Sequence, residues 1–177
     1  MLDVLYKRRS IRKFKEDPVE QEKIDSLVKA ALLAPSSRSR DTQRFIIVKD
    51  KLRLEQLSTS RDYGSAFLKN APLAIVISGD NSLSDVWVED TCIAASFLMI
   101  TAQSLGLGSC WVQIRNRFRD ENTSSDDYVK ELLNIPTEFN VECILALGYP
   151  AEDKGSHTDD KLKYEKVFED SFGNKVY

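Results

Sequence analysis

Basic side chains crowd one short stretch near the N-terminus, and a serine lies among them. The nine positions from 7 to 15 hold six cations, with Ile11 and Phe14 as apolar anchors. A guanidinium matches the oxygens of a phosphate, and a serine hydroxyl adds a short donor. The segment therefore predicts a site for an anion. Its polar members are Lys7, Arg8, Arg9, Ser10, Arg12, Lys13 and Lys15.

Two other interpretations of this segment compete with anion binding. Most runs of like charge are solvated surface, and spacing alone does not separate that interpretation from a ligand site. A nucleic-acid surface is less favoured, because such domains are usually basic, whereas this chain of 177 residues has a net charge of −3 and a pI of about 5.3. We therefore expect no nucleic-acid partner.

Two further segments have compositions that suit a ligand. Residues 34–40 read Ala-Pro-Ser-Ser-Arg-Ser-Arg, and residues 106–111 read Gly-Leu-Gly-Ser-Cys-Trp. Loops that follow a helix often bind ligands, and glycines allow a ligand or another backbone to approach closely. Simpler interpretations are a Pro-Ser helix stop with exposed arginines and a glycine C-cap.

Hydrophobic periodicity supplies the elements that must position these segments. Apolar residues at i, i+3, i+4 and i+7 predict a helix over 20–33, which Pro35 ends, and short apolar runs predict buried strands. One or two short helices are expected between the first two strands. The result is a mixed α/β (α+β) chain with one domain over 1–177. The expected elements are helices 2–9, 20–33, 85–105 and 125–133, and strands 45–48, 73–78, 109–114 and 141–148.

The helix over 85–105 is apolar around most of its circumference and ends at Gly106. Such a helix must be buried nearly all round. A second chain would complete its burial, which predicts a homodimer. The alternative is a central helix that the protein's own sheet covers.

Composition excludes several classes of protein. Three cysteines without a C-x-x-C pair predict buried thiols, and the single histidine, His157, argues against a metal centre or a Ser-His triad. Neither standard glycine-rich phosphate loop occurs, so side chains must hold any nucleotide. No apolar stretch reaches membrane-spanning length, and no secretory signal is visible. These features predict a cytoplasmic protein with no membrane partner.

Taken in order, the segments resemble the nitroreductase family of FMN-dependent oxidoreductases. The family signature R-R-S-x-R-x-F reads Arg8-Arg9-Ser10-Ile11-Arg12-Lys13-Phe14 here, and the resemblance covers nearly the whole chain. It implies a three-layer α-β-α sandwich with a mixed, mainly antiparallel central sheet, in a homodimer with FMN sites shared by both chains. The similarity continues through residues 18–19, 34–37, 45–48, 106–111 and 144–150.

The resemblance also implies which residues hold FMN. Arg8 and Ser10 would contact the phosphate with Arg9 alongside, and Arg12 would lie beside the flavin pyrimidine, where a fixed cation favours the reduced form. Residues 35–37 would reach the flavin from the second subunit, and the strand end at 110–113 would lie along the ring. A C-terminal lysine would complete the phosphate site. The residues expected to bind FMN are Arg8, Arg9, Ser10, Arg12, Pro35, Ser36, Ser37, Ser39, Cys110, Trp111, Val112, Gln113, Lys161 and, as the second choice of lysine, Lys163.

This chain departs from the family pattern after the Pro-Ser-Ser segment. Many relatives have an asparagine and then Gln-Pro-Trp, whereas here Ser39 and then Asp41-Thr42-Gln43 stand at these positions. Further along, Arg115, Arg117 and Arg119 alternate. If the preceding strand continued, they would share one face and guide NAD(P)H or an acidic acceptor. The alternative is salt-bridging to the acidic C-terminal part of the chain.

The family activity implied is that of an oxidoreductase. The enzyme would take a hydride from NADH or NADPH and then reduce a small acceptor, such as a nitroaromatic compound or a quinone, in the same pocket by a ping-pong mechanism. The flavin carries the chemistry, so no side chain is expected to act as acid, base or nucleophile. The alternatives are an FMN protein with another donor or reaction, such as dehalogenation, and a non-enzymatic dimer that binds polyanions.

Overall fold

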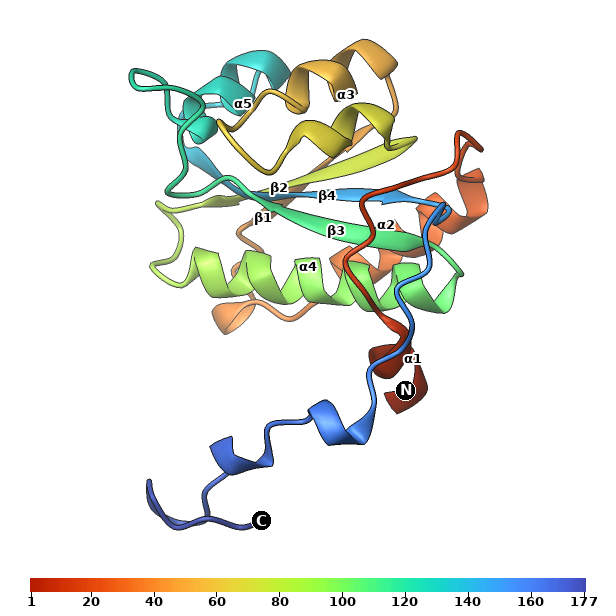
Figure 1. The fold of residues 1–177 in the computed structure, drawn as a ribbon. Coiled ribbons are helices and arrows are strands. Elements are labelled where there is room, and N and C mark those ends of the chain that lie inside the picture. The colour runs from red at the N-terminus through yellow and green to blue at the C-terminus, as the bar shows by residue number, and fades with distance from the viewer.

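A four-stranded antiparallel sheet forms the centre of the computed structural model, which describes residues 1–177 (Figure 1). The strand order is β1-β2-β4-β3. β2 is buried along its whole length and pairs with β4 in the middle of the sheet, while β1 and β3 form the two edges. The strands are β1 (Gln43–Val48), β2 (Leu73–Asp80), β3 (Gly108–Gln113) and β4 (Phe139–Gly148).

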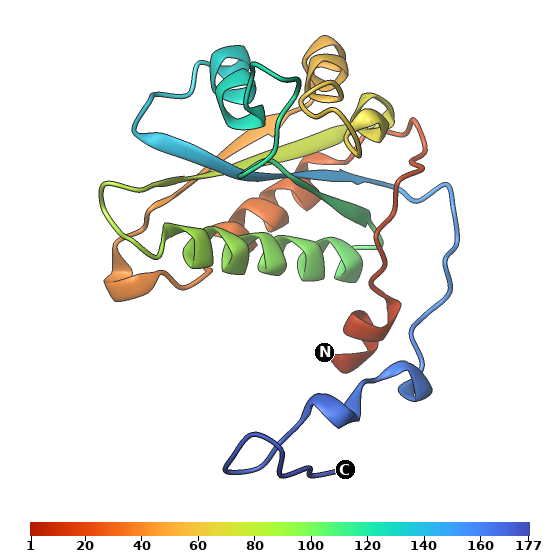
Figure 2. The ribbon, with the colours of Figure 1, turned by 60° about the vertical axis from the view of Figure 1, so that its left-hand side comes forward.

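Helices cover both faces of this sheet (Figures 1 and 2). On one face lie α2 (Gln21–Leu32) and α4 (Trp87–Ser104), and α1 (Leu2–Lys7) packs against α4 outside this layer. On the other lie α3 (Lys51–Leu57), the 3-10 helix η2 (Ala66–Asn70) and α5 (Ser125–Leu133). Successive residues of a strand point to opposite faces, so Leu145 joins the core beside α2 and α4, while Ile144 joins the core beside α3 and α5. The predicted three-layer α+β sandwich is confirmed.

The sheet is more regular than the resemblance implied. All three strand pairings are antiparallel, whereas a mixed sheet was expected. The one parallel pairing is an isolated bridge between Ser10 and Ser109, outside the four-stranded order.

Local capping explains where several helices begin and end. The Ser124 hydroxyl accepts the backbone N–H of Asp127 at 3.0 Å, and Asn134 ends α5 in the left-handed region at φ 54°. Asp50 caps α3 in the same way. The first helix ends two residues earlier than predicted, because Arg8 is extended at ψ 121°.

One side of α4 is open to solvent. Its buried residues include Asp90, Ala94 and Leu98, but Ile93 is 37% and Phe97 39% exposed. The protein's own sheet and α2 therefore cover only part of the apolar circumference that the sequence shows. None of the helices combines the length and the apolar character needed to cross a bilayer.

After β4 the chain leaves the sandwich as an arm, residues 149–177 (Figures 1 and 2). The arm first runs along residues 9–15 and then passes α1, where the backbone N–H of His157 donates to the carbonyl of Tyr6 at 2.8 Å. The Tyr6 hydroxyl also donates to Asp159, and this hydrogen bond raises the pKa of Tyr6. Two 3-10 turns follow, η3 (Asp159–Lys161) and η4 (Tyr164–Lys166).

Candidate functional site

The basic segment, residues 7–15, runs across one end of the sheet. Ile11 N–H donates to the carbonyl of Ser109 at 3.0 Å, next to the Ser10–Ser109 bridge. Further on, the backbone N–H of Lys15 donates to the carbonyl of Tyr149 at 2.9 Å. Hydrogen bonds to β3 and to the chain after β4 thus fix the backbone of the segment.

Glu152 and Lys154 hold the middle of the basic segment. The Glu152 carboxylate accepts the backbone N–H groups of Arg12 at 2.6 Å and Lys13 at 3.1 Å. Lys154 Nζ donates to the carbonyl of Ser10 at 2.7 Å and lies 3.5 Å from Glu152. The hydrogen bond from Arg12 is the main cause that lowers the pKa of Glu152 below its ordinary value of 4.5.

This lowered pKa predicts a pH-dependent contribution to stability. A carboxylate with a depressed pKa in the folded state stabilises the fold fully above the unfolded value, near 4.5, and loses this effect as the pH falls through the lower folded value. We expect Glu152→Gln to be less stable than the parent protein at pH 7, with the difference shrinking below pH 4.5. Urea unfolding between pH 7 and pH 3 measures it. The control is Glu131→Gln on the exposed side of α5, and a difference that does not change with pH would contradict the assignment.

The two adjacent arginines of the segment have different environments. Arg9 Nη1 donates to the carbonyls of Lys154 at 2.5 Å and Gly155 at 2.8 Å, so its guanidinium already holds the arm. Arg8 forms no hydrogen bond or ion pair through its side chain, although it is only half exposed. Arg8 is therefore the arginine that is free for a ligand.

Gly108 lets the basic segment approach the sheet. A Cβ atom at this position would lie 2.8 Å from the Cβ of Ile11 and 2.9 Å from both of its γ carbons. The close approach that the sequence predicted for this glycine is thus real, and the neighbour is the protein's own basic segment. The segment also places Ile11 in the core, where it is 7% exposed.

Gly108→Ala should therefore displace the basic segment. The branched carbons of Ile11 sit next to its backbone and cannot move away alone, and overpacking of this kind costs about 1–3 kcal/mol. We expect a lower midpoint of urea unfolding and weaker binding of any ligand that the segment holds. Ser104→Ala, on the exposed surface of α4, is the control. A Gly108→Ala protein with unchanged stability would show that the contact is not tight.

The β3 strand presents two backbone donors at the open edge of the sheet. Ile114 N–H donates to the carbonyl of Glu142 on β4 at 3.0 Å, so the even-numbered residues of this strand face β4. The odd-numbered ones face outward. The carbonyl of Ser109 is taken by Ile11, and the next two outward N–H groups belong to Trp111 and Gln113. These groups can bind the edge of a planar ligand.

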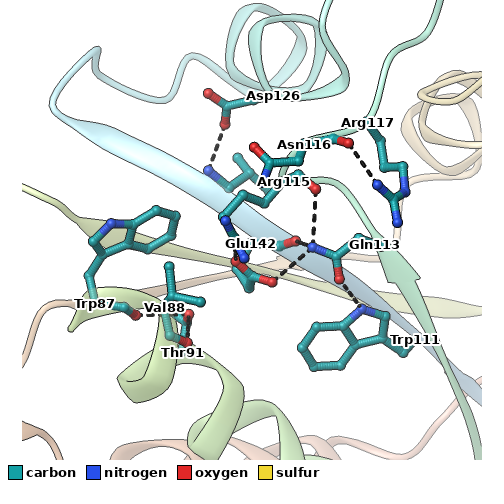
Figure 3. Close-up of polar contacts among 11 residues, drawn as sticks. Trp87, Val88, Thr91, Trp111, Gln113, Arg115, Asn116, Arg117, Asp126 and Glu142 are labelled. Atoms are coloured by element: carbon teal, nitrogen blue, oxygen red, sulfur yellow. Dashed lines mark hydrogen bonds and ion pairs between the residues drawn. The ribbon is translucent and has the colours of Figure 1, made fainter. Parts of the chain in front are cut away.

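A buried polar network fixes the side chain of Gln113 (Figure 3). Its amide accepts from Trp111 Nε1 at 2.9 Å and donates to Glu142 Oε1 at 2.9 Å. Arg115 Nε donates to Glu142 Oε2 at 2.7 Å, and the Glu142 side chain is only 3% exposed. Since a buried carboxylate needs a partner, the network ties the outer strand to β4 at this point.

The three alternating arginines do not form one face. β3 ends at Gln113, and Asn116 is in the left-handed region at φ 57°, so the strand does not continue through them. Arg115, Arg117 and Arg119 therefore do not share one face of a continued strand, which was the condition for guiding NAD(P)H or an acidic acceptor. Arg115 pairs with Glu142, as the salt-bridge alternative predicted, and the Arg119 guanidinium lies 4.1 Å from the centre of the Tyr128 ring.

Cys110 lies beneath the basic segment as a packed thiol. It is 2% exposed, and burial raises its pKa even though Arg12, Lys154 and Arg8 lie near enough to oppose that shift. Deep burial and a raised pKa are typical of a structural cysteine. All three cysteines are free; Cys110 and Cys143 are buried, as predicted, whereas Cys92 is partly exposed on α4.

The serine-rich loop 34–41 lies at the other end of α4 from the basic segment (Figures 1 and 2). Asp90, near the N-terminus of α4, accepts the backbone N–H of Ser37 at 2.8 Å and the hydroxyl of Thr42 at 3.1 Å. The basic segment contacts Ser109, beyond the opposite end of this helix. Eighteen helical residues span about 27 Å. Within one chain, Pro35, Ser36, Ser37 and Ser39 therefore do not meet Arg8 and Ser10.

The basic residue beside the segment was not predicted from the sequence. Lys161 and Lys163 are exposed on the arm, and neither forms a side-chain hydrogen bond or an ion pair. Lys154 instead contacts Ser10. A signal for it was present, because Lys154 follows Pro150 by four residues, and the chain after β4 must pass the segment that pairs with its end.

Comparison with known proteins gives the family. The sequence profile of the nitroreductase family matches residues 5–60 and 50–149. The solved structure of an FMN-dependent nitroreductase from Clostridium difficile has 51% identity and a TM-score of 0.96, covering 97% of this chain and 100% of that one.

Two curated relatives extend the comparison over most of the chain. A provisionally named NADH dehydrogenase/NAD(P)H nitroreductase from Archaeoglobus fulgidus is 34% identical over 94% of this chain and 95% of its own. An iodotyrosine deiodinase from Thermotoga neapolitana is 28% identical over 92% and 95%. With the family profile spanning most of the fold and the relatives covering it almost end to end, this chain belongs to the nitroreductase family.

Proposed function

We propose that this protein is an FMN-dependent oxidoreductase that takes a hydride from NADH or NADPH and reduces a small organic acceptor. The observation that carries the proposal is the placement of a free cation and a hydroxyl, Arg8 and Ser10, next to the open edge of β3. FMN needs a cation and a hydroxyl for its phosphate, next to a strand edge for its planar ring. The names of the relatives from Clostridium difficile and Archaeoglobus fulgidus support the same activity.

The residues beside β3 fit the phosphate group of FMN. Arg8 and Ser10 have side chains without a hydrogen-bond partner, and Lys154 lies against the same backbone. Together they supply two positive charges and one hydroxyl, which suits a phosphate dianion. Arg9 supports the site by holding the arm that carries Lys154. Lys161 and Lys163, farther along the arm, are the other cations proposed for the phosphate.

The remaining predicted residues fit the flavin ring. The backbone N–H groups of Trp111 and Gln113 face the open edge, with Cys110 and Val112 buried behind them, so the strand can orient the polar rim of a ring. Arg12 is the cation for the pyrimidine end, where it would stabilise negative charge. When bound, FMN accepts and donates the hydride. The protein's side chains bind and orient, and none is proposed as acid, base or nucleophile.

A second copy of the chain is proposed to complete the site. The loop of Pro35, Ser36, Ser37 and Ser39 is too far from Arg8 to act within one chain, and Asp90 holds it in a fixed shape. The open face of α4, with Ile93 and Phe97, supplies apolar surface for a homodimer. We propose that residues 1–177 form a single FMN-binding domain, and that the protein is cytoplasmic, in keeping with its three free thiols.

The acceptor is proposed as a nitroaromatic compound or a quinone, reduced after the oxidised nicotinamide leaves, by ping-pong kinetics. Reductive dehalogenation is the second candidate, and the observation in its favour is the similarity to the iodotyrosine deiodinase over 92% of this chain. A simple assay separates the two candidate activities. A dehalogenase releases halide from a halogenated phenol under reducing conditions, whereas a nitroreductase consumes NAD(P)H with a nitroaromatic acceptor.

The visible absorption spectrum of the freshly purified protein tests the proposal. We expect a flavin spectrum, release of about one FMN per chain on heating, and bleaching by NADH or NADPH without oxygen. A colourless protein that also fails to bind added FMN would overturn the proposal. It would favour the remaining alternative, a dimer that binds polyanions. A flavoprotein that neither nicotinamide reduces would point to another electron donor.

A further inference from the structure

A cavity adjoins the basic segment at residues 12–16. It has a volume of about 570 Å³ and opens between this segment, the start of α2, the end of β1 and η2. Of the residues assigned to FMN, only Arg12 lines it. The cavity therefore shares Arg12 with the proposed flavin site, and its other lining residues have no part in the proposed function.

Positive charge gathers around the rim of this cavity from three parts of the chain. Four lysines and one arginine line it, and the one acidic residue among its lining is Glu16. None of the five cations forms a salt bridge, although the chain has a net charge of −3 and carboxylates are plentiful. Two of the cations make weak neutral contacts: Lys49 lies 3.4 Å from the Gln21 amide, and Arg12 lies 5.8 Å from the Phe67 ring. The five are Arg12, Lys13, Lys49, Lys51 and Lys69.

The floor of the cavity is apolar and belongs to the core. It includes Val19, Ile24 and Leu54, which are 9%, 2% and 2% exposed. These side chains come from the chain before α2, from α2 and from α3, so packing on both faces of the sheet fixes their positions. A ligand that fits this shape has an apolar body against the floor and a multiply charged anionic group at the rim.

We propose that this cavity binds a small phosphate monoester with an apolar organic body. A phosphate dianion at the rim would neutralise part of an excess of positive charge that the protein's own acids leave unpaired. An apolar body would replace water over the core residues of the floor. The volume lies within the range of small-molecule sites and is too small for a macromolecular surface. The inference does not depend on the bound flavin.

Calorimetric titration with 1-naphthyl phosphate tests the proposal. The protein is first saturated with FMN, so that the flavin phosphate occupies the proposed site at Arg8. Two probes separate the parts of the ligand: 1-naphthol has the apolar body without charge, and inorganic phosphate has the charge without the body. We expect 1-naphthyl phosphate to bind at least tenfold more tightly than either of these probes. Its affinity should fall as the salt concentration rises from 50 to 200 mM, because salt screens the charges.

Variants locate the binding. Lys49→Gln combined with Lys69→Gln removes two rim cations and should weaken the binding of 1-naphthyl phosphate at least tenfold. The matched control, Lys29→Gln combined with Lys175→Gln, changes two exposed lysines elsewhere and should leave this binding unchanged. All four side chains are exposed, so the variants should fold, and Lys51→Gln provides a second test at the rim. Arg8→Ala should not affect this binding, which distinguishes the cavity from the flavin site.

Three results would overturn the proposal. One is no binding of 1-naphthyl phosphate below millimolar concentration. Another is equal binding by the rim variant and its control. The third is equal affinity for 1-naphthyl phosphate and inorganic phosphate, which would mean an adventitious ion only.

Discussion

Arg8→Ala combined with Ser10→Ala is expected to yield a protein that purifies without flavin. A hydrogen bond to a charged group contributes about 1.5–3 kcal/mol, and these two side chains would make such bonds to the same phosphate. Losing both should cost about 3–6 kcal/mol, which corresponds to a dissociation constant about 10² to 10⁴ times higher. Fluorescence titration with FMN measures the constant directly.

The fold should survive this double substitution, because neither side chain makes a hydrogen bond within the protein and the backbone bridge to Ser109 is retained. Circular dichroism and the urea midpoint check that it does. The control is Lys29→Ala combined with Ser26→Ala, which removes a cation and a hydroxyl from α2, away from the site. A double variant that still carries one FMN per chain would place the phosphate elsewhere and would direct attention to Lys161 and Lys163.

Glu142→Ala should destabilise the protein by about 2 kcal/mol. Truncation leaves the Gln113 amide and the Arg115 guanidinium without their shared acceptor in a site where the carboxylate is 3% exposed. Breaking a fully buried pair costs about 3–5 kcal/mol. Arg115 is 38% exposed and water can solvate it, so we expect a smaller loss, of about 2 kcal/mol. Urea unfolding measures the loss.

The same substitution has a second readout near the flavin. The backbone N–H of Gln113 faces the open edge of β3, and its side chain is tied to Trp111 and Glu142, so releasing the side chain should loosen this edge and shift the absorption maxima of bound FMN. The control is Glu131→Ala, an exposed glutamate on α5, for which a change within 0.5 kcal/mol is typical. If Glu142→Ala matched this control in both stability and spectrum, the network would have no role in holding the strand edge.

The sequence predicted most of the sandwich, because the signals for its elements are local. The periodicity over 20–33 and the apolar run at 73–78 identified α2 and β2, and both boundaries held to within two residues. The stretch after Gln113 was harder, because an alternation of arginines looks like a strand. The left-handed residue Asn116 interrupts it, and a non-glycine residue in that conformation leaves no pattern in the sequence.

The candidate site was only partly visible from the sequence. The motif from Arg8 to Phe14 identified the basic segment and, by resemblance, the strand beside it. Lys154 was missed because nothing local marks a lysine that meets a backbone carbonyl 144 residues away. The cationic cavity was invisible for a similar reason. Its charges come from the basic segment, the end of β1 with the start of α3, and η2, and only the fold brings these together.

The contacts of Glu152 and Lys154 with the basic segment also set the order in which the protein can fold. Residues 10–13 leave the ribosome about 140 residues before these two partners, so until then the segment has only its contacts with β3. Contacts of such long sequence separation contribute to high contact order and form late, because closing a long loop costs entropy. We therefore expect the contacts of Glu152 and Lys154 with the basic segment to form late in folding, so that the phosphate site proposed there is completed only after the sandwich has formed.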